Sequence, residues 1–129
     1  MIILGHPLLK CDTFSQINNK QDIKNTPSNS VVLATYGLEI MEYCYENNIP
    51  YGVFVTSITE AIFANNLRAK YLIVEMVTAK QIQNIAENYM FDSKVIVVID
   101  GDDFIDEVAQ NGIDGVIYRD FLEKIGETR

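Results

Sequence analysis

The chain has 129 residues, of which 48% are hydrophobic and 22% charged, and its formal net charge is -8. This length and balance are typical of one soluble globular domain with a real hydrophobic core. The acidic balance and the lack of a Lys/Arg cluster disfavour a nucleic acid as partner, because a phosphate backbone would be repelled. No apolar run reaches the roughly 20 residues of a membrane-spanning helix, so no membrane partner is expected.

The start of the chain, MIILGHPLLK, has no basic region before its apolar residues, and a proline interrupts it early. It is therefore not expected to be a signal peptide. Cys11 and Cys44 are far apart and form no CxxC motif, which favours reduced thiols. The expected location is the cytoplasm.

Residues 1–30 differ from the rest of the chain. IILG and FSQI can form short strands, whereas NNKQDIKNTPSNS is polar and rich in turn formers. We expect a β-hairpin or an added edge strand, followed by a surface loop that could also be mobile. This N-terminal β element and polar loop would belong to one α/β domain spanning 1–129.

From residue 31 to 129 the sequence predicts repeating βα units. Segments with helical spacing, such as Ile82, Ile85, Ala86 and Tyr89, separate five β-rich runs. Runs that are apolar on both faces and alternate with helices indicate a mostly parallel sheet of about five strands. The runs are VVLAT (31–35), YGVFV (51–55), YLIVE (71–75), KVIVVI (94–99) and GVIYR (115–119).

Boundary residues agree with this pattern. The segments 57–60 and 78–81 both fit a capping box, in which the first and fourth residues satisfy each other's free backbone N–H groups. Gly112 and the pair Asn47-Asn48 fit helix ends. The strand order stays open at this point: a flavodoxin-like sandwich with a crevice at a switch in order is favoured over a half-barrel of sequential strands.

The segments NGIDGVIY (111–118) and ANNLRAKYLIV (64–74) are similar to the helix-to-strand turns of phosphate-binding (β/α) barrels. The resemblance implies a (β/α) fold and close helix packing, and it implies no activity. The glycine-rich phosphate loop of such barrels would follow the last strands, where this chain has acids at 100–103. Receiver domains share the alternation, but their functional acids and lysine are not matched by Gly5-His6-Pro7 or Arg119. No functional family is matched.

Ligands of parallel α/β sheets bind outside the carboxyl ends of the strands. Asp100 and Glu75 follow two such strands and are candidates for catalysis and for a metal, with Mg²⁺ as the cofactor that such oxygen ligands would suit. His6, the only histidine, is the third catalytic candidate. Thr35, Thr56, Ser57 and Arg119 are candidates for binding a small anionic ligand.

Each of these residues also has a simpler interpretation, and that interpretation is favoured. In VIVVIDGDDF (95–104), Asp102 can be a helix N-cap, and its neighbouring acids can stabilise the first turn. His6 fits a surface turn, and Ser57 a capping box. Arg119 can pair with Asp120 or Glu123 on the surface.

Two functions follow as hypotheses. The first is a noncatalytic module that associates with itself, as a homo-oligomer, or binds another protein. It rests on missing catalytic motifs, on seven tyrosines in a chain without tryptophan, and on a sheet face that could lack a cover. The alternative is a small-molecule or metal-dependent enzyme with its site at the carboxyl ends of the strands.

Overall fold

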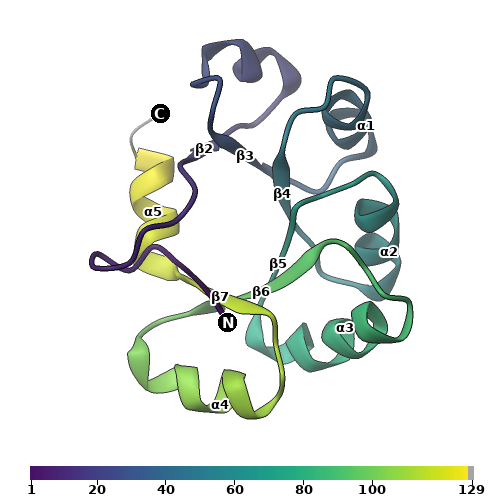
Figure 1. The fold of residues 1–129 in the computed structure, drawn as a ribbon. Coiled ribbons are helices and arrows are strands. Elements are labelled where there is room, and N and C mark those ends of the chain that lie inside the picture. Colours follow the sequence, from purple (N-terminus) through teal and green to yellow (C-terminus); the bar gives the residue numbers. More distant parts are fainter. Residues whose placement is uncertain (128–129) are drawn as a thin grey trace.

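All five apolar runs form strands in the computed structural model, which describes residues 1–127 (Figure 1). Two short N-terminal strands join them in one sheet of seven parallel strands. The α/β class is therefore confirmed. The strands are β1 (Ile2–Leu4), β2 (Phe14–Gln16), β3 (Val31–Thr35), β4 (Tyr51–Phe54), β5 (Tyr71–Val74), β6 (Lys94–Ile99) and β7 (Gly115–Tyr118). The helices are α1 (Leu38–Glu46), α2 (Ile58–Asn66), α3 (Met76–Asn88), α4 (Ile105–Gln110) and α5 (Arg119–Glu127), with short 3₁₀ helices η1 (Lys20–Asn25) and η2 (Asp102–Phe104).

The strand order is β1-β7-β6-β5-β4-β3-β2, and the preference for a flavodoxin-like sandwich is not supported. From β3 to β7 each strand lies beside the next one in the chain, so the order never reverses. The sheet instead curls into a half-barrel, which was the alternative (Figure 1). An apolar run indicates how deeply a strand is buried, but it does not indicate which strand lies beside it. The sequence therefore could not decide between the two strand orders.

The two N-terminal strands lie at opposite edges of the sheet. β1 pairs with β7 and β2 pairs with β3, both in parallel. The expected β-hairpin is therefore wrong, and the alternative of an added edge strand is realised at both edges. A segment of nine residues (5–13) crosses from one edge to the other.

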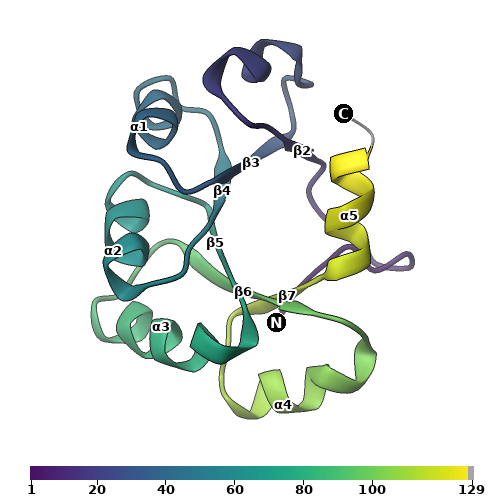
Figure 2. The same ribbon diagram turned by 180° about the vertical axis from the view of Figure 1, so that it is seen from behind.

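Helices α1 to α4 cover the outer face of the sheet, and α5 lies on the inner side, across the opening between the edge strands β1 and β2 (Figures 1 and 2). Side chains alternate along each strand between two hydrophobic layers, an outer one on the side of α1 to α4 and an inner one on the side of α5. Leu72 packs among the outer residues, and Ile73 packs among the inner residues with Ile125 of α5. Burying such a side chain contributes about 1.5–3 kcal/mol, so both layers stabilise the curl.

Helix α5 has no counterpart among the elements expected from the sequence. The last expected element was a strand that ended at Arg119. Its apolar residues Phe121, Leu122 and Ile125 all pack in the inner layer. Gly5, just after β1, has a φ of +92°, and a Cβ built on it would lie 2.5 Å from the ring of Phe121. The crossing segment therefore begins in direct contact with α5.

The four outer helices end with the same turn. One residue has a left-handed backbone, and the N–H of the next donates to the carbonyl five residues before it, which is the Schellman motif. The left-handed residues are Asn48 (φ 54°), Arg68 (φ 62°), Met90 (φ 51°) and Gly112 (φ 69°). The bonds are Ile49 to Cys44 (2.9 Å), Ala69 to Ala64 (3.0 Å), Phe91 to Ala86 (2.8 Å) and Ile113 to Val108 (3.3 Å). The expected helix ends at Asn47-Asn48 and Gly112 are thus confirmed.

None of the helices within residues 1–127 combines the length and the apolar character that crossing a bilayer requires.

Candidate functional site at the carboxyl ends of the strands

Three of the residues singled out from the sequence meet at the carboxyl end of the half-barrel. Glu75 follows β5, Asp100 follows β6 and Arg119 follows β7. These three strands are neighbours in the sheet, so the residues after them lie side by side. The site follows directly from the sequential strand order.

Arg119 bridges the two carboxylates. Its Nη2 donates to Glu75 Oε1 at 2.9 Å and its Nη1 to Glu75 Oε2 at 3.3 Å, while its Nε donates to Asp100 Oδ1 at 2.7 Å. The hydrogen bonds to Glu75, and then those to Asp100, raise the pKa of Arg119 above its usual value. The guanidinium therefore stays charged. About half of each side chain is exposed, so water screens the attraction.

A hollow of about 340 Å³ lies beside this bridge. Phe54, Val98 and Leu122 give it an apolar floor, and Glu123 of α5 adds a further carboxylate to its wall. The other lining residues are Gln16, Glu75, Arg119 and Gly126. The hollow has an apolar floor and both positive and negative charges at its margin. It therefore suits a small amphipathic molecule better than a bare anion.

The expected magnesium site at Glu75 and Asp100 stays a prediction. Arg119 already supplies a positive charge to both carboxylates, so a metal bound by both has to displace the guanidinium. Within residues 1–127, no three or more His, Cys, Asp or Glu side chains are grouped as metal ligands. A magnesium ion would therefore take most of its oxygen ligands from water.

Thr35, Thr56 and Ser57 lie at the same end of the sheet but make no hydrogen bond to the Arg119 bridge. Thr35 lines a separate hollow of about 280 Å³ near η1 and the start of α1. Thr56 donates through its N–H and Oγ1 to Glu60 Oε1, at 2.8 and 3.2 Å. Ser57 Oγ accepts from the N–H of Glu60 at 3.2 Å, as its capping role predicts. The returning bond of Glu60 goes to Thr56, however, one residue earlier than expected.

The capping box expected at 78–81 is wrong. Helix α3 begins at Met76 with Glu75 in the N-cap position, and Thr78 lies inside the first turn, where its Oγ1 donates to the carbonyl of Glu75. The chain thus passes from β5 into α3 without a loop. Because of this short connection, Glu75 is held at the rim on rigid backbone.

His6 lies in a surface turn, where its Nδ1 accepts from the N–H of Leu8 at 3.1 Å. Its ring centroid is 5.8 Å from that of Tyr118. The Tyr118 hydroxyl donates to Asp102, and this hydrogen bond raises the pKa of Tyr118 to about 12. Gly101, and not Asp102, holds the N-cap position of the 3₁₀ helix η2, so the expected N-cap at Asp102 is wrong. Sequence reasoning missed Tyr118, because nothing in a strand-end tyrosine indicates which acid it will face.

Comparison with models of known protein families gives no match for this chain, and a search of curated proteins finds no relative.

Proposed function

We propose that this protein is a noncatalytic module that binds protein, with a second copy of itself as its first partner. The contact uses the end of the half-barrel at which the strands begin, opposite the Arg119 bridge. There the ends of α1, α2 and α3 present a group of large side chains. We call this group the tyrosine surface, and it comprises Tyr45, Arg68, Tyr89 and Met90.

Two contacts support its continuity across three neighbouring helices. The guanidinium carbon of Arg68 lies 5.5 Å from the centroid of the Tyr45 ring, within the range of a cation–π contact. Ser93 Oγ donates to the carbonyl of Ala69, the residue after Arg68. This bond joins the turn that follows α2 to the loop between α3 and β6, in which Met90 also lies.

One observation carries the proposal, namely the left-handed backbone at Arg68 and Met90. A residue other than glycine in this conformation costs about 1 kcal/mol or more. The equivalent turn after α4 uses Gly112, which avoids that cost. Met90 is 85% exposed, so its side chain does not offset the cost through burial within the chain, and the neighbouring Tyr89 is also 70% exposed. Methionine, tyrosine and arginine are residues that protein interfaces favour.

The test measures association and stability on the same variant. Wild-type protein is expected to form dimers or larger species as its concentration rises, measured by sedimentation velocity. Met90→Gly relieves the backbone strain and removes the exposed side chain. It should raise the free energy of unfolding by about 1 kcal/mol and weaken association. Loss of assembly in a more stable protein cannot be attributed to unfolding.

Val77→Ser is the matched control. Val77 is 90% exposed near the start of α3, at the opposite end of the half-barrel. Removing this apolar side chain should leave association unchanged. A wild-type protein that is monomeric at every soluble concentration contradicts self-association. Equal association of Met90→Gly and wild type rules out the tyrosine surface as the contact.

The meeting of Glu75, Asp100 and Arg119 beside an apolar hollow favours a second candidate function. In this function, the protein is an enzyme that binds a small molecule or a magnesium ion at the carboxyl ends of the strands. Mg²⁺ should then raise the melting temperature of the wild-type protein, and Asp100→Asn should abolish that increase. An equal response of both proteins to Mg²⁺ removes Asp100 from this role.

A further inference from the structure

Strand β2 has one backbone edge with no neighbour. Its other edge pairs with β3, where the N–H of Val31 donates to the carbonyl of Thr13 at 2.7 Å and that of Ile17 donates to the carbonyl of Leu33 at 2.9 Å. Because hydrogen-bonding directions alternate along a strand, the N–H and C=O groups of Phe14 and Gln16 point away from β3. In residues 1–127 none of these four groups has a hydrogen-bond partner.

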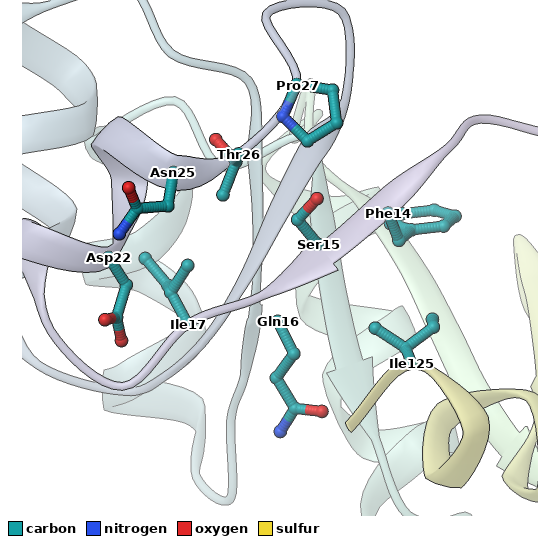
Figure 3. Close-up of a pocket in the computed structure, with 9 residues that line it drawn as sticks. All are labelled: Phe14, Ser15, Gln16, Ile17, Asp22, Asn25, Thr26, Pro27 and Ile125. Atoms are coloured by element: carbon teal, nitrogen blue, oxygen red, sulfur yellow. The ribbon is translucent and has the colours of Figure 1, made fainter. Parts of the chain in front are cut away.

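A hollow of about 410 Å³ runs along this segment (Figure 3). Phe14 packs in the inner layer and Ile17 in the outer layer, yet both line the hollow. It therefore follows the backbone edge and not one face of the strand. Residues around η1 form one wall and Ile125 of α5 stands on the other side (Figure 3). The full lining is Phe14, Ser15, Gln16, Ile17, Asp22, Asn25, Thr26, Pro27 and Ile125.

We propose that β2 takes an extended, basic peptide segment of a partner protein as an added strand. Backbone donors and acceptors that alternate along an open edge are matched by another strand, and side chains in the adjoining hollow select it. The chain as a whole carries a net charge of -8. This charge favours a positively charged segment over an acidic one.

This surface and this partner differ from those of the proposed self-association. β2 lies at the edge of the sheet next to α5, whereas the tyrosine surface lies on the turns after α1, α2 and α3. Met90→Gly should therefore bind the peptide as wild type does. The two proposals can fail separately.

The probe is a capped peptide of alternating lysine and valine, added to the full chain and followed by amide NMR. Resonances of residues 14–17 and 22–27 should shift. When the protein is nine-tenths bound, hydrogen exchange at the Phe14 and Gln16 amides should slow about tenfold. The matched glutamate–valine peptide should bind more weakly, and added salt should weaken the lysine–valine complex.

Two changes test strand addition itself. A lysine–valine peptide N-methylated at alternate residues cannot pair along one edge, and it should not bind in that register. Gln16→Pro removes an outward N–H that makes no bond in the fold, and should reduce affinity for the unmodified peptide. Equal binding of the methylated peptide, or shifts confined to other elements, overturns the proposal. Hydrogen exchange at Phe14 and Gln16 could instead be slow without peptide and become slower as the protein concentration rises. That result would assign the β2 edge to a second copy of the chain, and it would also overturn the proposal.

Discussion

Gln83 and Asp114 hold each other through two reciprocal hydrogen bonds. Gln83 Nε2 donates to Asp114 Oδ1 at 3.2 Å, and the N–H of Asp114 donates to Gln83 Oε1 at 3.0 Å. Asp114 also accepts from the N–H of Val95 through Oδ2 and from the N–H of Ile2 through its carbonyl. The pair therefore ties α3 to the starts of β1, β6 and β7.

Gln83→Ala is expected to lower the free energy of unfolding by about 2 kcal/mol, because it leaves Asp114 with an unsatisfied N–H beside the core. Gln83 is only 3% exposed, so water cannot replace the amide without rearrangement. Gln81→Ala in the same helix, at an exposed position, should change stability little. Urea unfolding of both variants checks the difference, and equal midpoints would contradict a structural role for the pair.

Gly5→Ala tests the contact between the crossing segment and α5. The added methyl meets the Phe121 ring at 2.5 Å and the φ of +92° is strained for alanine, so we expect a loss of more than about 2 kcal/mol. Gly112→Ala is the control. Its φ is also positive, at +69°, but no atom lies within 4 Å of the added methyl. Thermal unfolding should show a loss of about 1 kcal/mol there, from backbone strain alone.

Asp12 gives the stability a dependence on pH. Its Oδ2 accepts from Lys70 Nζ at 2.7 Å and from the Tyr71 hydroxyl at 2.6 Å, and these bonds hold its pKa below the usual value. The stabilisation is therefore complete above the ordinary carboxyl pKa and is lost as the pH falls through the lowered one. Asp12→Asn should cost about 1 kcal/mol at neutral pH, given the partly exposed pair. The difference between the two proteins in urea should shrink in acid, and a constant difference would argue against this linkage.

The Arg119 bridge should contribute little to stability. Its side chains are 41% exposed for Arg119 and 58% for Glu75, and exposed pairs contribute about 0–1 kcal/mol. A double-mutant cycle with Glu75→Gln and Arg119→Gln should give a coupling energy below about 1 kcal/mol that falls with added salt. A larger, salt-independent coupling would mean that the bridge is more rigid and drier than its exposure indicates.

The alternation of strands and helices could be predicted because each long strand is apolar on both faces. VVLAT and KVIVVI match β3 and β6 at both ends. The neighbours of β1 and β2 could not be predicted, since strands of three residues carry no periodicity and their partners are set by tertiary packing. Helix α5 was missed for a different reason. The apolar spacing of Phe121, Leu122 and Ile125 was available, but the preceding strand was extended into it.

At the carboxyl end, the sequence allowed Glu75, Asp100 and Arg119 to be placed at one rim, because strand ends share an edge. It could not show that Arg119 would bridge the two acids, which depends on β5, β6 and β7 being neighbours. The same dependence on strand order explains why Thr35 and Thr56 stand apart from the bridge. Their strands, β3 and β4, lie farther along the sheet.

The pairing of β1 with β7 also bears on how the chain folds as it is made. Ile2 lies opposite Gly115, so within this sheet the first strand in chain order pairs with the last one. The units from β3 to β6 can assemble in order as they emerge, because each rests on the one before. β1 must remain an unpaired apolar segment until β7 has been synthesised. A nascent chain that stalls before residue 115 therefore has ordered units from β3 to β6 and a β1 without its strand neighbour.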